Sequence, residues 1–171
     1  RRTVMRPDEM LTDITFPALG SGERGMFIKL GLRKAQAISV VDVAVVMQVK
    51  ETSTGLVGSK ARIALGSVSP TVIRASLAEE YLEGKNLDNQ VLEQASILSM
   101  QAARPIDDLR SSAAYRCEMV RVTVLRALKA IRDGEIDGWF PKDPVMLWGE
   151  DEGRPACSFA AAWTDSEAQK S

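Results

Sequence analysis

The chain of 171 residues contains no histidine. Without an imidazole it cannot build a Ser-His-Asp triad, a Cys-His dyad or a histidine-ligated metal site. Its two cysteines, Cys117 and Cys157, are 40 positions apart and form no CxxC motif. This spacing argues against an iron–sulfur or zinc site within the chain. It leaves a disulfide between the two cysteines open, but a reduced cytoplasmic setting is the simpler interpretation.

The sequence also lacks an excess of charge of either sign and a long hydrophobic run. Its 22 basic and 23 acidic residues give a formal net charge of −1, so no global field favours nucleic acid or an anionic membrane. No apolar run approaches the roughly 20 residues that a transmembrane helix needs. The first residues, Arg1-Arg2-Thr3, include neither an initiator methionine nor an apolar leader. We therefore expect the chain to be part of a longer polypeptide.

The first half of the chain carries strand signals. Extended segments are predicted at 26–30 and 36–50, the second being rich in valine, which packs well on an enclosed pleated surface. A turn region at 52–58 follows, and residues 60–65 then alternate between apolar and polar. The face predicted to be buried carries Ala61, Ile63 and Leu65. Further upstream, residues 9–16 are predicted to form a short strand.

The second half of the chain carries helix signals. Ser69 can cap a first helix with Pro70 at its first position, and Gly84 can end it. Its inner stripe is predicted to hold Val72, Ile73, Leu77 and Leu82. Two more helices are predicted at 88–103 and 112–132. Strands followed by helices predict an α+β fold: an antiparallel sheet of three to four strands, packed on one face by three helices, with a C-terminal extension.

Two cations stand directly ahead of the valine-rich segment. Lys29 and Arg33, with Gly31 between them, precede a run that is almost wholly apolar. A desolvated charge at the mouth of a buried strand needs an anionic or carbonyl-rich partner. The alternative is a pair of exposed loop cations, which the residue types alone favour.

A family resemblance shifts this balance. The stretches that carry it include, in this order, Pro7-Asp8-Glu9-Met10-Leu11-Thr12-Asp13-Ile14, Phe27-Ile28-Lys29-Leu30-Gly31-Leu32-Arg33-Lys34-Ala35-Gln36-Ala37-Ile38-Ser39-Val40-Val41, Ile63-Ala64-Leu65-Gly66-Ser67-Val68-Ser69-Pro70-Thr71, Ala78-Glu79-Glu80-Tyr81-Leu82-Glu83-Gly84-Lys85, and Pro105-Ile106-Asp107-Asp108-Leu109-Arg110-Ser111-Ser112-Ala113-Ala114-Tyr115-Arg116. Together they resemble the C-terminal domain of the FAD-binding (medium) subunit of the aerobic carbon monoxide dehydrogenase and xanthine dehydrogenase family, the molybdenum hydroxylases. The similarity extends over residues 1–131.

The resemblance implies a role for two residues. A lysine at the position of Lys29 lies by the pyrimidine edge of the flavin in this family, and Leu11 matches a position where an apolar side chain packs near the ring. Arg33 and Gln36 are expected to organise the loop rather than to touch flavin. The segment 20–25 is rich in glycine but precedes no helix, so it lacks the N–H groups that hold a pyrophosphate. FAD is therefore expected to bind mainly through an N-terminal domain that this chain does not contain.

The resemblance also implies partners. Besides the N-terminal FAD-binding domain, they are an iron–sulfur subunit and a molybdopterin subunit, with electrons passing from molybdopterin through iron–sulfur clusters and FAD to an acceptor. The expected function is thus to help form the flavin pocket and the subunit contacts of a multi-subunit oxidoreductase, with no catalytic residue of its own. The alternative is a flavin-independent interaction module that has kept the scaffold.

The remaining signals are structural. Residues 132–171 fall outside the resemblance and hold all three tryptophans, Trp139, Trp148 and Trp163, so a C-terminal extension that folds over the domain or a neighbour is expected, with a partly disordered tail as the alternative. The adjacent carboxylates Asp107 and Asp108 do not share a helix face, and they are expected to cap the following helix rather than to act in catalysis.

Overall fold

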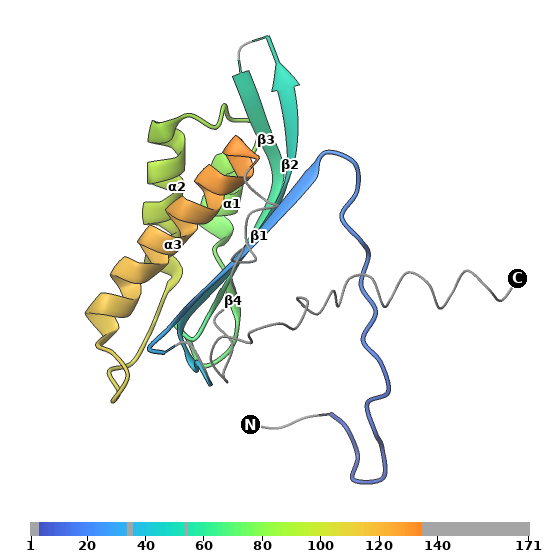
Figure 1. Cartoon of the computed structure of the whole chain (residues 1–171), viewed down its shortest axis with the longest axis vertical. Helices are drawn as coiled ribbons and strands as arrows, with labels where there is room; N and C mark the ends of the chain where they lie inside the picture. Colours follow the sequence, from blue (N-terminus) through green and yellow to red (C-terminus); the bar gives the residue numbers. More distant parts are fainter. Residues whose placement is uncertain (1–3, 34–35, 54, 135–171) are drawn as a thin grey trace, which may run out of the picture.

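A computed structural model describes residues 4–33, 36–53 and 55–134. Four antiparallel strands form one sheet in the order β1-β2-β3-β4, and three helices cover one of its faces (Figure 1). The strands are β1 (Glu23–Gly31), β2 (Ser39–Thr52), β3 (Gly55–Gly66) and β4 (Ile73–Arg74). The helices are α1 (Ser76–Leu82), α2 (Asn89–Ala102) and α3 (Ala113–Asp133). The predicted α+β fold is confirmed; the expected extension lies outside the described residues from 135 onward.

The core lies between the sheet and the helices. Alternate residues of β2 point into it and are fully buried: Val41, Val43, Val45 and Met47. They pack with apolar side chains from β3 and from the helices, among them Ile63, Leu65, Leu92, Val124 and Leu128. The predicted inward face of 60–65 is confirmed, because Ala61, Ile63 and Leu65 all belong to this cluster. Burial of such aliphatic side chains is the main stabilising term of the fold.

The two longer helices begin where the sequence predicts. The Asp88 side chain accepts a hydrogen bond from the Val91 N–H, and the Ser112 side chain accepts one from the Tyr115 N–H, so each satisfies an N–H group that the first helical turn leaves free. Gly134, in the left-handed conformation at φ 73°, ends α3. The N-caps Asp88 and Ser112 are the first residues of the predicted helices 88–103 and 112–132.

The prediction for the first helix was wrong at its start. Residues after Gly66 form a loop and the short strand β4, and α1 begins only at Ser76, without a side-chain cap. Of its predicted inner stripe only Leu82 is buried, while Val72 and Leu77 are exposed. Pairing of β4 with Ala64 and Leu65 extends the sheet at this point, so tertiary contact overrides the local Ser-Pro signal.

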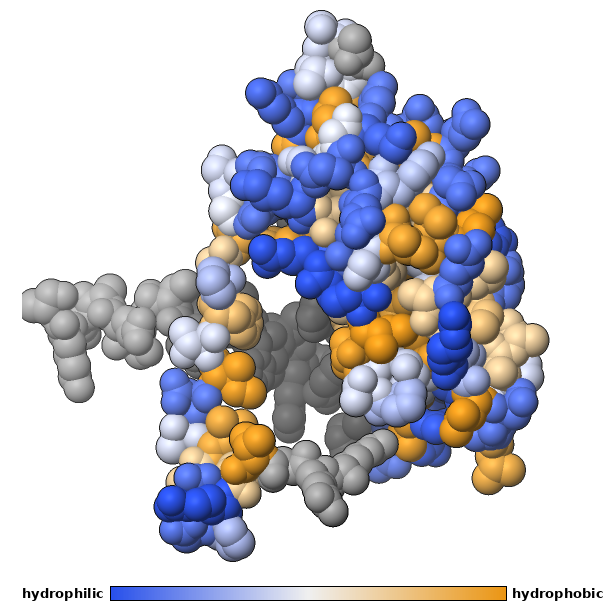
Figure 2. Space-filling view, turned by 180° about the vertical axis from the view of Figure 1, so that it is seen from behind, coloured by the Kyte–Doolittle hydropathy of each residue, from blue (hydrophilic) through white to orange (hydrophobic). Residues whose placement is uncertain are grey.

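The prediction of a strand at 9–16 was also wrong. The described segment before β1 contains no strand, and its larger part stands away from the sheet and helices in both views (Figures 1 and 2), while Leu19 near its end lies beside Gly25 of β1. Its large apolar side chains are exposed: Val4, Met5, Met10, Leu11, Ile14, Phe16 and Leu19. A strand needs a hydrogen-bonded partner, and none of the strand pairs among the described residues includes residues 9–16.

Candidate functional site

Lys29 lies on the face of the sheet that the helices leave open. In the β1–β2 ladder Ile28 pairs with Val43, whose side chain enters the core, and Lys29 pairs with Asp42. Successive side chains of a strand point to opposite faces, so Lys29 and Asp42 both project from the open face. The Lys29 side chain is exposed, and none of the ion pairs among the described residues includes it. Its ammonium group is therefore available to a ligand.

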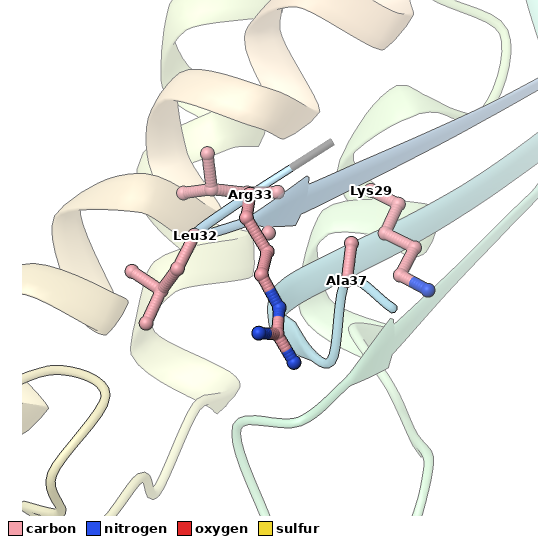
Figure 3. Close-up of a pocket in the computed structure, with 6 residues that line it drawn as sticks. Lys29, Leu32, Arg33 and Ala37 are labelled. Atoms are coloured by element: carbon pink, nitrogen blue, oxygen red, sulfur yellow. The ribbon is translucent and has the colours of Figure 1, made fainter. Parts of the chain in front are cut away.

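A shallow, open hollow of about 610 Å³ adjoins Lys29. Its walls come from the end of β1 and the loop that follows: Lys29, Leu30, Gly31, Leu32, Arg33 and Ala37. Figure 3 shows the Lys29 ammonium and the Arg33 guanidinium on either side of Ala37. Gly31 shapes the hollow, because a Cβ at this position would lie only 2.8 Å from the Ala37 Cβ. The two cations predicted to stand at the mouth of the strand thus line one cavity, and both are exposed.

Arg33 is bound to its own loop. Its Nε donates to the Gln36 carbonyl at 3.4 Å, and its Nη2 donates to the Gln36 side-chain oxygen at 3.5 Å. These long, exposed contacts are weak. Gln36 itself has a positive φ of 45°, which is uncommon for a residue with a side chain. The arrangement agrees with the expectation that both residues organise the loop.

Asp42 is held in place from the other side of β2. It pairs with Gly66 across the β2–β3 ladder, and its Oδ2 accepts a hydrogen bond from the Ser67 hydroxyl at 3.2 Å. A Cβ at Gly66 would overlap with Asp42 Oδ1 and lie 2.7 Å from Asp42 Cγ. The carboxylate therefore occupies the space above Gly66, on the β3 side of its strand and away from Lys29. Sequence reasoning missed this group, although an acid between Val41 and Val43 in an apolar run was a usable signal.

Arg116 fixes the same end of the sheet from beneath. This buried side chain on α3 donates from Nη1 to the carbonyls of Val40 (2.7 Å) and Ser67 (3.0 Å), and from Nη2 to Asp108 Oδ1 (2.7 Å). Burial of an arginine requires such partners. Arg116 thus docks α3 against the sheet, and the contact also positions Ser67, whose φ of 63° is unusual for serine.

The pair Asp107-Asp108 is structural, as predicted. Asp107 Oδ1 accepts a hydrogen bond from the Ala113 N–H at 2.7 Å, at the first residue of α3. Hydrogen bonds from Arg110, and after it from Arg116, hold the pKa of Asp108 well below its usual range. Neither carboxylate lines the hollow beside Lys29.

The second predicted site residue, Leu11, is not brought to the hollow. It lies in the extended segment before β1, its side chain is 66% exposed, and it is not among the residues that line the cavity. Its role beside a ring remains a prediction. Cys117 is half-buried on α3, and the part of the chain that the structure describes holds no cluster of three or more His, Cys, Asp or Glu side chains suited to a metal. Nor does that part contain a helix long and apolar enough to cross a bilayer.

Known proteins resemble this chain over most of the region that the structure describes. The family model of the CO dehydrogenase flavoprotein C-terminal domain matches residues 27–131. The chain is 31% identical over 128 residues to the carbon monoxide dehydrogenase medium chain of Hydrogenophaga pseudoflava, covering 75% of this chain and 43% of the relative. It is 28% identical to the nicotine 6-hydroxylase medium subunit of Paenarthrobacter nicotinovorans, covering 74% and 42%.

Solved structures agree. A carbon monoxide dehydrogenase structure from Hydrogenophaga pseudoflava superposes with a TM-score of 0.61 at 35% identity, covering 67% of this chain and 38% of that one. The reconstituted CO dehydrogenase from Oligotropha carboxidovorans gives a TM-score of 0.60 at 29% identity, covering 68% and 39%. The chain spans less than half the length of these relatives. The range matched by the family model contains Lys29, and the chain belongs to the CO dehydrogenase flavoprotein C-terminal domain family.

Proposed function

We propose that this domain forms one wall of a flavin pocket in the FAD subunit of a molybdenum hydroxylase, with Lys29 at the pyrimidine edge of the ring. The observation that carries the proposal is the position of Lys29. Its ammonium is exposed, without an ion pair among the described residues, and beside an open hollow on the helix-free face of the sheet. A ring held by another domain could contact it there.

The residues present fit the ring of FAD but not its pyrophosphate. Helix N-termini with free N–H groups are the usual phosphate sites, yet the Gly-rich segment 20–25 leads into β1. The N-termini of α2 and α3 are occupied by the side chains of Asp88 and Ser112. The proposal therefore assigns the pyrophosphate to an N-terminal FAD-binding domain.

Lys29 would act by electrostatics. When bound, FAD supplies reversible two-electron chemistry, and its reduced form concentrates negative charge around N1 and O2 of the ring. A fixed ammonium at that edge stabilises the reduced form. A charge-assisted hydrogen bond contributes about 1.5–3 kcal/mol, which corresponds to roughly 30–65 mV for a two-electron couple. Leu11 would pack against the flavin ring when the N-terminal FAD-binding domain covers the segment before β1.

The setting of the domain follows from the family. We propose that electrons reach the flavin from an iron–sulfur subunit fed by a molybdopterin subunit and then leave to an acceptor. The chain's relatives include CO dehydrogenase and nicotine 6-hydroxylase subunits, which act on different substrates, so substrate choice is assigned to another subunit. A cytoplasmic location is proposed because the cysteine spacing favours a reduced setting.

The test is Lys29→Ala in the full-length protein. With FAD bound, its two-electron midpoint potential is expected to fall by roughly 30–65 mV, since the reduced ring loses a charge-assisted hydrogen bond. Lys50→Ala makes the same change of charge at an exposed position near the tip of the β2–β3 hairpin, and it is expected to leave the potential unchanged. Spectroelectrochemical titration measures both. An unchanged potential in Lys29→Ala would remove Lys29 from the site. A full-length protein that binds no FAD would favour the interaction module.

A further inference from the structure

We infer that Gly66 keeps Lys29 available for its ligand by giving the Asp42 carboxylate a place away from it, so that Gly66 and Asp42 act as positioning residues. The inference rests on the proposed function for its consequence at the flavin. The three residues occupy one row across the open face of the sheet, since Asp42 pairs with Lys29 on β1 and with Gly66 on β3.

Lys29 and Asp42 would ordinarily form an ion pair, because they lie directly opposite each other on neighbouring strands. Residues directly opposite on antiparallel strands have Cβ atoms about 4.5–5.5 Å apart, within easy reach of a lysine and an aspartate. The described residues nevertheless form no salt bridge between these two side chains. The Asp42 carboxylate instead leans over Gly66 and accepts the Ser67 hydroxyl hydrogen bond at 3.2 Å.

Gly66 makes this placement possible because it lacks a side chain. The three nearest atoms that a Cβ at Gly66 would meet all belong to the Asp42 carboxyl group: Oδ1, Cγ and Oδ2. Gly66 does not have a positive φ, so alanine fits its backbone and only the carboxylate would have to move. The other lateral direction open to the Asp42 carboxylate leads from β2 toward Lys29 on β1. Arg116 supports the present arrangement by holding the Ser67 carbonyl at 3.0 Å.

The placement has a chemical consequence. A lysine paired with a carboxylate shares its hydrogen bonds and its charge with that partner, and it stabilises a second anion less. Because the Asp42 carboxylate lies over Gly66, the N–H groups of the Lys29 ammonium remain free to donate to the ligand. Gly66→Ala should therefore convert an available lysine into a paired one without changing Lys29 itself.

The first test needs no flavin. In the flavin-free full-length protein, acetylation of Lys29 by acetic anhydride is followed by mass spectrometry. Gly66→Ala is expected to slow it about two- to fivefold, the range of an exposed ion pair. In an Asp42→Ala background the same substitution is expected to have no effect. Gly25→Ala is the matched control, because its methyl lies on the same open face and meets Leu19 and Val46 rather than a carboxylate.

The second test uses the protein with FAD bound. Gly66→Ala is expected to lower the flavin midpoint potential in the direction of Lys29→Ala, and to have no further effect when Lys29 is already alanine. Unchanged acetylation and unchanged potential in Gly66→Ala would overturn the inference. If Gly66→Ala slows acetylation but Lys29→Ala leaves the flavin midpoint potential unchanged, the inference about Asp42 is upheld and the flavin role of Lys29 is refuted.

Discussion

The two faces of β2 differ although they belong to one strand. On the covered face Val41, Val43, Val45 and Met47 are all 0% exposed. On the open face the alternating residues are only half-buried: Asp42, Ala44, Val46 and Gln48. The covered face is filled with aliphatic groups that belong to one core cluster with side chains of α1, α2 and α3. The open face carries the candidate site.

The open face is also lined with small side chains. Ala44 pairs with Ala64, Asp42 with Gly66, and Gly25 with Val46. Phe27, on the same face, is 55% exposed. At the small residues a planar group or another domain has room to approach the backbone closely. Alternate residues of the same strands thus serve stability and ligand contact. A substitution can therefore change one of these properties without the other.

The largest effect should come from a cavity on the covered face. Ile63→Ala is expected to lower the free energy of unfolding by about 2–5 kcal/mol, because Ile63 is fully buried and its loss leaves a void. Its neighbour Arg62 is exposed and points to the open face, so Arg62→Ala should change stability by less than about 0.5 kcal/mol. Urea denaturation of both variants measures the difference. Similar losses in the two variants would contradict the assignment of faces.

A glycine-to-alanine substitution on each face compares how tightly the two faces are packed. Gly58 is buried, and a Cβ there would lie 2.9 Å from both Leu87 Cδ2 and Met47 Cε in the core. Gly58→Ala should therefore cost about 1–3 kcal/mol through overpacking. The methyl of Gly66→Ala meets the Asp42 carboxylate, which can turn toward Lys29 on the open face, so this substitution should cost less. Thermal unfolding of the two variants decides this. A greater loss in Gly66→Ala would mean that the open face is packed like a core.

The smallest effect concerns the pH dependence of stability through Asp108, which binds Arg116 at one end of the sheet. The pKa of Asp108 is lowered in the folded protein, so its contribution to stability is complete above the unfolded value of about 3.9 and is lost as the pH falls through the lower folded value. Asp108→Asn should be less stable than the parent at neutral pH, and the gap should narrow as the pH drops below about 4. Denaturant titrations at several pH values measure the gap. A gap that stays constant would show that the charge of Asp108 does not matter.

Much of the fold could be predicted from local signals. The helical spacing of apolar residues placed the starts of α2 and α3 at Asp88 and Ser112, and the alternation of residues 60–65 identified the buried face of β3, because such periodicity acts within a few residues. The signal at Pro70 failed for the opposite reason. Loop residues there are held by contacts with distant parts of the chain, such as the hydrogen bond from the Arg104 N–H to the Val68 carbonyl.

The candidate site divides in the same way. Lys29 was found from its motif, and the hollow confirms that its side chain lies at an open surface, although its ligand remains a proposal. Asp42 and Gly66 were missed, because they are 24 positions apart and only the β2–β3 register places one over the other. The partners of Arg116 were missed likewise, since Val40 and Ser67 come from other parts of the chain.

The sequence by itself determined which residues form the two long helices, which strand residues enter the core, and to which family the motifs belong. Each of these depends on neighbours in the chain or on a fixed period of two or 3.6 residues. Only the tertiary structure decided that the Asp42 carboxylate lies over Gly66 rather than against Lys29. That choice depends on strand register and on the space left by a missing side chain, and neither is written in any local stretch of residues.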